Sequence, residues 1–307
     1  MLSVLAPGQG SQKPGFLIPW LELPGVAERL GSWSELIGID LVHLGTTATQ
    51  EEITDTAKTQ PLLTAAALLA AEQLPIEDVD LVAGHSVGEL GASVMAGVLT
   101  PEAALRLATA RGREMAAACA LTPTGMSAVL GGDDQVVREA IEQAGAYPAN
   151  INGAGQVVAA GTTEALARLA DNPPPGARVR SLSVAGAFHT PYMKPAQAKL
   201  TAFASTLEPA DPERTWLSNA DGSAMESGNQ ALLRLVAQVT TSVRWDECMK
   251  TMTKLGVTAI VELPPAGTLA GLAKRAMPGM EIVKVNTPDD LEAARDLINR
   301  NRKERTA

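Results

Sequence analysis

The sequence is poor in the residues that build several common kinds of site. Of its 307 residues, two are cysteines and three are histidines, and no Cys-x-x-Cys pair is present. We therefore expect no structural zinc site, because such sites combine Cys and His ligands at short spacings. Aromatic residues make up 3% of the chain, which leaves little for stacking against unpaired bases. The low cysteine content fits a reducing compartment.

Long apolar runs and positive charge are also scarce. The apolar stretch 62–71 is too short to cross a bilayer, and the first eight residues lack the basic segment that opens a secretory signal. The formal net charge of −9 disfavours nucleic acid and anionic membranes as partners. We expect a cytoplasmic globular protein, with a monomer as the simplest assembly.

Short apolar runs alternate with helical patterns along much of the chain. Residues 2–6 and 79–83 predict buried strands, each followed by a glycine-rich turn. Pro61 predicts the first turn of an Ala/Leu-rich helix. Thr100 and Pro101 predict the cap and first residue of another helix. Because strands that alternate with helices form parallel sheets, the fold class is α/β, with a large domain similar to the α/β hydrolases.

The middle of the chain follows a different pattern. Between residues 123 and 187 the expected order is strand, helix, strand, strand, helix, strand, which is typical of a ferredoxin-like unit. We interpret this segment as a small ferredoxin-like domain inserted into the large one. The large domain then consists of residues 1–122 and 188–307.

The segment Gly84-His85-Ser86-Val87-Gly88 has the form G-x-S-x-G and follows the second predicted strand. Between a strand and a helix this pattern predicts a nucleophile elbow, a sharp turn that exposes the serine. The glycines leave space where a Cβ atom would collide with the strand or the helix. The following helix directs its N-terminus at Ser86, where free N–H groups can stabilise an oxyanion. An ordinary glycine turn is the alternative interpretation.

A serine nucleophile needs a base, and the candidates are His43, His85 and His189. His85 adjoins the serine and points away from it on a tight turn, and His43 lies in a stretch without turn residues. We expect both to be structural. His189 lies in a loop between Gly186 and Pro191, where functional residues are common. No histidine follows it, which disfavours a plain esterase and favours a Ser-His dyad held by a backbone carbonyl.

Five short motifs occur in one order along the chain. They are Gly8-Gln9-Gly10-Ser11-Gln12, Gly84-His85-Ser86-Val87-Gly88-Glu89, Arg111-Gly112, Asn150-Ile151-Asn152 and Ala187-Phe188-His189-Thr190. With their spacing they resemble the malonyl-CoA:acyl carrier protein transacylases, in particular the actinobacterial members that serve type II fatty acid synthesis. The resemblance extends over essentially the whole chain, and the motifs are highly specific as a set.

The resemblance implies a role for each motif. Ser86 would be the acylated nucleophile and His189 its base. The backbone N–H groups of Gln9 and Val87 would form the oxyanion hole. Arg111 would hold the free carboxylate of the malonyl group, and a planar guanidinium can bind a carboxylate through two hydrogen bonds where lysine cannot.

The same resemblance assigns further residues around the site. Gln60 and Asn152 would line the pocket, and Phe188 would narrow it, so that malonyl is preferred over methylmalonyl. Relatives orient the histidine through the main-chain carbonyl of the residue before a tryptophan. That residue is Arg244 here, where many relatives have glutamine, and a backbone acceptor does not depend on the side chain.

The implied activity is transfer of a malonyl group from malonyl-CoA to the phosphopantetheine thiol of an acyl carrier protein, in fatty acid or polyketide synthesis. The route is a Ser86 ester with ping-pong kinetics. No metal or bound cofactor is needed, since the partner carries the phosphopantetheine. Three alternatives stay open: an acyltransferase subunit of malonate decarboxylase, an acyl hydrolase using the same serine, and a catalytically silent module that docks the carrier protein.

Acyl carrier proteins are acidic, so a basic rim is expected around the pocket despite the net negative charge. The candidates are Arg178, Arg180, Lys194, Lys199, Lys274 and Arg275.

Overall fold

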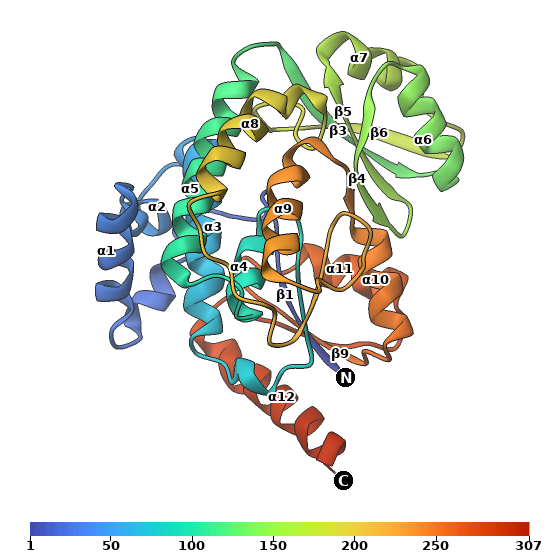
Figure 1. Cartoon of the computed structure of the whole chain (residues 1–307). Coiled ribbons are helices and arrows are strands. Elements are labelled where there is room, and N and C mark those ends of the chain that lie inside the picture. Colours follow the sequence, from blue (N-terminus) through green and yellow to red (C-terminus); the bar gives the residue numbers. More distant parts are fainter. Residues whose placement is uncertain (307) are drawn as a thin grey trace.

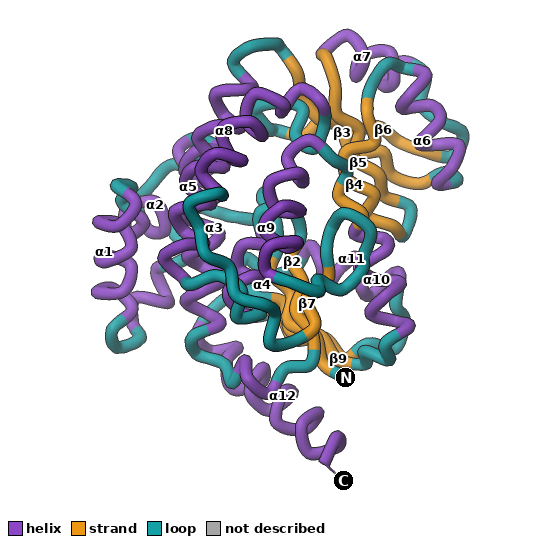
Figure 2. Tube along the Cα trace, viewed as in Figure 1, coloured by secondary structure: helices purple, strands orange, loops and turns teal. Residues whose placement is uncertain are grey.

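Two five-stranded sheets organise the chain, and the computed structural model describes residues 1–306, with side chains up to residue 303. The first sheet is parallel throughout, with strand order β10-β9-β1-β2-β7, and lies at the lower centre of Figure 2. Its strands are β1 (Leu2–Ala6), β2 (Leu81–Gly84), β7 (Thr215–Leu217), β9 (Ala259–Glu262) and β10 (Glu281–Lys284). This sheet confirms the predicted α/β class.

Helices surround the parallel sheet (Figure 1). They are α1 (Val26–Ile37), α2 (Leu41–Thr46), α3 (Thr56–Ala71), α4 (Gly88–Met95), α5 (Pro101–Cys119), α8 (Lys194–Ala204), α9 (Gly228–Ala237), α10 (Trp245–Lys254), α11 (Thr268–Ala276) and α12 (Leu291–Thr306). Short 3-10 turns join them: η1 (Ile18–Glu22), η2 (Glu52–Thr54), η3 (Ile76–Asp78), η4 (Pro191–Met193), η5 (Gln238–Thr240) and η6 (Pro288–Asp290). Within residues 1–306, no helix is both long and apolar enough to span a membrane.

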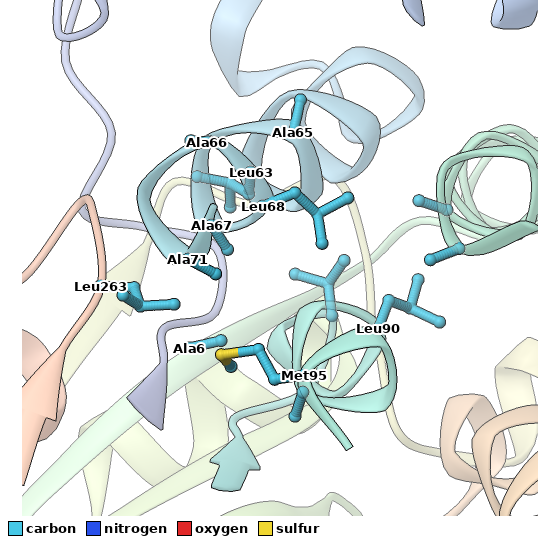
Figure 3. Close-up of a cluster of buried hydrophobic side chains, with 14 of the residues drawn as sticks. Ala6, Leu63, Ala65, Ala66, Ala67, Leu68, Ala71, Leu90, Met95 and Leu263 are labelled. Carbon is cyan, nitrogen blue, oxygen red and sulfur yellow. The ribbon is translucent and has the colours of Figure 1, made fainter. Parts of the chain in front are cut away.

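Helix α3 is buried on nearly all sides in the main core. Its alanines let neighbouring elements approach closely, and Figure 3 shows Leu68 of α3 and Leu90 of α4 in one apolar cluster with Ala6 of β1. The helix begins at Thr56, because the Asp55 side chain accepts the Ala57 N–H (3.0 Å) and caps it. The prediction that Pro61 forms the first turn is therefore wrong, since Pro61 lies inside the helix.

The second sheet lies at the upper right of Figure 1, with strand order β6-β3-β5-β4-β8. Its strands are β3 (Thr124–Gly131), β4 (Tyr147–Gly153), β5 (Gln156–Thr162), β6 (Ala177–Leu182) and β8 (Val243–Arg244), and its helices are α6 (Asp134–Gln143) and α7 (Thr163–Asp171). The elements from β3 to β6 follow the order expected from the sequence. The division into a ferredoxin-like domain at residues 123 and 187 stays a prediction.

Strand β8 was not predicted. It comes from the C-terminal part of the chain and pairs in parallel with β4, matching Asn150 with Val243 and Ile151 with Arg244. The second sheet therefore includes a strand from outside its own contiguous segment, and β8 ties it to the body of the protein.

Candidate active site

The turn between β2 and α4 is an elbow of the predicted kind. Ser86 adopts a left-handed backbone conformation with φ of 54°, which is uncommon for a residue other than glycine and is a strain typical of functional sites. The flanking glycines are required by space. A Cβ at Gly88 would lie 2.1 Å from the carbonyl oxygen of Ala6, and one at Gly84 would lie 2.1 Å from the carbonyl of Gly88. The close packing of β1, β2 and α4 therefore fixes the serine at the end of the sheet.

Ser86 and His189 are joined by a hydrogen bond of 2.8 Å between Oγ and Nε2. The other ring nitrogen of His189, Nδ1, lies 2.8 Å from the backbone oxygen of Gln238. Because a carbonyl can only accept, Nδ1 carries the proton and Nε2 is free to accept from the serine hydroxyl. His189 also has a positive φ of 61°. The pair has the geometry needed for a base to withdraw the serine proton.

Arg111 lies on α5 and brings a buried positive charge to the serine. One Nη2–H points at Ser86 Oγ over 3.4 Å, while Gln60 Oε1 and Gln238 Oε1 each accept from the guanidinium at 2.7 Å. Burial lowers the pKa of Arg111 to about 10, and the negative charge of Glu89 opposes that shift. The side chain therefore stays cationic at neutral pH, and two amide oxygens fix its plane beside Ser86.

A cavity of about 510 Å³ opens over these groups. Its wall includes the predicted site residues Gln9, Gln60, Ser86, Val87, Arg111, Asn152, Phe188 and His189, together with Gln156. Among residues 1–306 the backbone N–H groups of Gln9 and Val87 donate to no protein acceptor, so both remain available to a bound oxygen. The cavity thus combines a serine hydroxyl, a neutral imidazole, a fixed guanidinium and free amide donors.

A sequence model described as an acyl transferase domain matches residues 5–291. The chain belongs to the acyl transferase family. This acyl transferase is 52% identical over 303 residues to the malonyl CoA-acyl carrier protein transacylase of Mycobacterium tuberculosis, covering 97% of this chain and 100% of the relative. The resemblance inferred from the sequence motifs is therefore confirmed.

Solved structures agree with this assignment. The crystal structure of MCAT from Mycobacterium tuberculosis matches the acyl transferase with a TM-score of 0.93 and 52% identity, covering 96% of this chain and 99% of that one. A type II PKS acyl-carrier protein in complex with its malonyl-transacylase matches with a TM-score of 0.89 and 31% identity, covering 96% of this chain and 99% of that one. The fold is thus shared over nearly the full length.

The acyl transferase orients its histidine differently from the prediction. The acceptor of the His189 Nδ1 proton is the carbonyl of Gln238, and the assignment of Arg244 is wrong. Arg244 lies six residues after Gln238, at the end of β8, where it pairs with Ile151 of β4 and its N–H donates to the backbone oxygen of Asn219 (2.7 Å). Its guanidinium binds Asp246 at 2.9 Å. The residue before Trp245 therefore anchors β8 and does not touch the histidine.

Two further residues of the acyl transferase site, Gln238 and Asn219, were missed by the sequence analysis. The side chain of Asn219 accepts the Ser86 N–H and donates to the Gly84 carbonyl, both at 2.8 Å, and so clamps the elbow from both sides. Asn219 lies just beyond β7, and polar residues after parallel strands meet at one sheet edge, which is a usable signal. Gln238 follows α9 with no recognisable motif around it.

The other two histidines, for which structural roles were predicted, hydrogen-bond to other side chains and not to the Ser86 hydroxyl. His85 Nε2 lies 2.9 Å from Asn152 Oδ1, so this side chain ties the elbow to β4 of the second sheet. The ring of His85 also meets Trp245 edge-on at 5.7 Å. His43 lies on α2, where its ring contacts Thr47 and Glu52, and it is not among the residues lining the cavity.

The acid–base state of His189 leads to a testable expectation. Burial lowers the pKa of His189 to about 3, and the nearby Arg111 charge and His85 act in the same direction. Because only the neutral ring can accept a proton, the base form persists on acidification from pH 7 to pH 5. A histidine with its ordinary pKa of about 6.5 would lose roughly 30-fold in base form at pH 5.

We therefore expect the reaction of Ser86 with phenylmethylsulfonyl fluoride, an uncharged reagent, to keep nearly the same rate constant between pH 5 and pH 7. The measurement is the rate of mass gain of the intact chain at each pH, with circular dichroism confirming that the protein stays folded. A drop with a midpoint near pH 6.5 would show that the pKa of His189 is not depressed.

Proposed function

We propose that this acyl transferase moves a malonyl group from malonyl-CoA to the phosphopantetheine thiol of an acyl carrier protein, through an ester on Ser86. One observation carries the proposal: the Ser86 hydroxyl lies 2.8 Å from His189 and 3.4 Å from the buried cation of Arg111. A nucleophile, its base and a carboxylate receptor therefore meet at one point of one cavity. The relatives in Mycobacterium tuberculosis and Mycolicibacterium smegmatis are malonyl CoA-acyl carrier protein transacylases, which supports the same substrate and partner.

The first half-reaction acylates the serine. As Oγ attacks the thioester carbon, its proton passes to Nε2 of His189, and the negative charge of the tetrahedral intermediate lies on the former carbonyl oxygen. The free N–H groups of Gln9 and Val87 can hold that oxygen, and losing one such donor typically costs about 3 kcal/mol. The C–S bond then breaks, and the coenzyme A sulfur leaves with the proton from His189. The backbone carbonyl of Gln238 keeps the ring in the required tautomer.

The second half-reaction returns the enzyme to its starting state. The phosphopantetheine thiol gives its proton to His189 and attacks the ester carbon. When the ester C–O bond breaks, Ser86 takes that proton back. Because the donor, malonyl-CoA, and the acceptor, the carrier protein, use the cavity in turn, ping-pong kinetics follow. No step draws on a metal or a bound cofactor.

Selection of the malonyl group rests on Arg111. A malonyl thioester carries one free carboxylate. Gln60 and Gln238 accept hydrogen bonds from the Arg111 guanidinium and fix its plane, so that its remaining N–H groups can bind this carboxylate. Phe188 is buried in the cavity wall, and its bulk leaves less space for the α-methyl branch of a methylmalonyl group. A charged, narrow pocket also keeps the ester from water, which favours transfer over hydrolysis.

The carrier protein would approach the rim of the cavity. Candidate basic residues there are exposed at two places: Arg178 and Arg180 on β6, and Lys274 and Arg275 on α11. Leu182 at the end of β6 and Thr268 at the start of α11 both line the cavity. Lys199 is a weaker candidate, because its ammonium group already pairs with Glu114 at 2.8 Å.

The test is to mix the protein with malonyl-CoA, quench in acid and measure the mass of the intact chain, followed by peptide mapping. We expect one malonyl adduct on the peptide that contains Ser86, and its transfer to holo acyl carrier protein on addition. Free malonate appearing faster than transfer would identify a hydrolase. No adduct and unchanged malonyl-CoA would refute the proposal and favour a docking module.

A further inference from the structure

A buried carboxylate that has no role in the proposed chemistry lies one helical turn beyond the serine. Glu89 is in the first turn of α4 and is 1% exposed. Its Oε1 accepts the backbone N–H of Asn219 at 2.7 Å, and its Oε2 accepts Nε2 of Gln238 at 2.6 Å. No ion pair within 4.0 Å joins Glu89 to a cation among the side chains of residues 1–303. Burying a carboxylate is unfavourable, so this placement requires a reason.

The reason lies in the amide of Gln238, which stands between Glu89 and Arg111. Its Oε1 faces Arg111, which can only donate, at 2.7 Å. Its Nε2 faces three acceptors: Glu89 Oε2 at 2.6 Å, and Ser86 O and Asn219 Oδ1 at 3.2 Å. Rotating the amide by 180° would turn an NH₂ group toward the guanidinium and an oxygen toward the carboxylate. The pattern of donors and acceptors therefore allows one orientation only.

We propose that Glu89 is a positioning residue, which fixes the amide of Gln238 and thereby holds Arg111 for the substrate carboxylate. This inference rests on the proposed function, because it assigns Arg111 to the malonyl group. Glu89 touches neither the nucleophile nor the base through its side chain. Glu89 acts on Arg111 through the side-chain amide of Gln238. Removing the Glu89 carboxylate should therefore slow the reaction selectively for acyl-CoA substrates that carry a free carboxylate.

Substitution by glutamine isolates this role. The position serves two donors, Asn219 N–H and Gln238 Nε2, and a glutamine amide has one acceptor oxygen. In Glu89→Gln one donor must therefore face another donor, or Gln238 must turn its NH₂ toward Arg111. Either outcome disturbs the orientation of the Arg111 guanidinium, although glutamine has nearly the same shape and volume as Glu89.

The ionisation of Glu89 provides a second readout. Burial raises its pKa to about 8, against the opposing effects of the Asn219 N–H, the Arg111 and Arg234 charges and the Gln238 amide. Only the carboxylate form accepts from both donors. The buried thiol of Cys248 also faces this cluster, and burial raises its pKa well above the usual value, so it stays protonated here. The preference for malonyl over acetyl donors should rise between pH 7 and pH 9 in the wild type and stay flat in Glu89→Gln.

The main experiment compares malonyl-CoA with acetyl-CoA, which lacks the free carboxylate, as donors for acylation of Ser86. At pH 9, where Glu89 is ionised, we expect Glu89→Gln to lower the second-order acylation rate constant roughly 30-fold for malonyl-CoA and less than about threefold for acetyl-CoA. The matched control is Glu114→Gln, which changes another buried glutamate, on α5, that contacts Arg113 and Lys199. This control should leave the ratio of the two donors unchanged. Equal losses for both donors in Glu89→Gln would overturn the proposal.

A double-mutant cycle tests whether Glu89 affects the preference for malonyl-CoA through the side-chain amide of Gln238. Gln238→Met keeps the backbone carbonyl that binds His189 and removes the amide. If Glu89 acts through that amide, Glu89→Gln in the Gln238→Met background should change the donor ratio less than about threefold further. Additive effects would show that Glu89 acts on Arg111 directly through its charge and would contradict the proposed route.

Failure of the Glu89 inference can be distinguished from misfolding of a variant and from failure of the proposed function. Should Glu89→Gln fail to fold by circular dichroism, Gln238→Met alone decides: it should lose malonyl selectively, and equal loss of both donors would overturn the proposal. If wild-type protein forms no malonyl adduct at all, the proposed function has failed. If the wild type is acylated but the variants keep its donor ratio, only the inference about Glu89 has failed.

Discussion

Replacing Ser86 with alanine is expected to lower malonyl transfer roughly 10,000-fold or more, and replacing His189 with alanine should have nearly the same effect. In the proposed route the serine oxygen forms the covalent bond, and among the side chains of residues 1–303 His189 is the only base that hydrogen-bonds to the Ser86 hydroxyl. The nearest other group, Arg111, is a cation that can only donate. Because the two residues act as one unit, the double variant should be hardly slower than either single variant.

The measurement is the steady-state rate of malonyl transfer to holo acyl carrier protein, followed by carrier-protein mass. His43→Ala is the matched control, since that histidine lies on α2 with a partly exposed side chain, contacts Glu52 and Thr47, and does not line the cavity. It should retain wild-type turnover. Turnover in Ser86→Ala within tenfold of the wild type would rule out a Ser86 ester as the route.

Replacing Gly88 with alanine is expected to destabilise the fold by about 4 kcal/mol or more, or to prevent folding. The added Cβ would lie 2.1 Å from the Ala6 carbonyl oxygen and 2.8 Å from both the Ala6 carbon and the Pro7 oxygen. All three are backbone atoms, so no side-chain rotation relieves the overlap. Strand β1 and helix α4 would have to separate, and β1 is the central strand of the parallel sheet.

Urea denaturation followed by circular dichroism measures this effect. The control is Gly31→Ala in α1, where an added Cβ meets no atom within 4 Å. Alanine favours a helix over glycine by up to about 1 kcal/mol, so this control should be as stable as the wild type or more stable. A midpoint for Gly88→Ala equal to that of the wild type would contradict the observed packing of the elbow.

The parts of the site that the sequence predicts are those that carry local geometry. The elbow at Ser86 could be inferred because a strand, two spaced glycines and a helix are needed together, and these features lie within a few residues. The choice of His189 followed from elimination among three histidines. The α/β class followed from alternating patterns. In each case the physical requirement is expressed over a short stretch of chain.

The parts of the site that the sequence did not predict depend on contacts between residues that are far apart along the chain. Gln238 lies 152 residues from Ser86 along the chain, and nothing next to it signals that its carbonyl meets His189. The misassignment of Arg244 has the same origin, since a backbone acceptor leaves no trace in side-chain chemistry. The start of helix α3 was predicted wrongly because proline is common in the first turn of helices. In the structure the Asp55 cap and burial on all sides determine where the helix begins.

Strand β8 affects how fragments and chimeras of this protein should be designed. The outer edge of β4 is covered over two residue pairs, Asn150–Val243 and Ile151–Arg244, by a strand that lies about ninety residues later in the chain. A fragment containing only residues 123–187 would leave these backbone groups without their partners. Uncovered strand edges pair readily with other copies and promote aggregation. A chimera that exchanges this segment between relatives should therefore include the segment around residues 243–244 from the same donor.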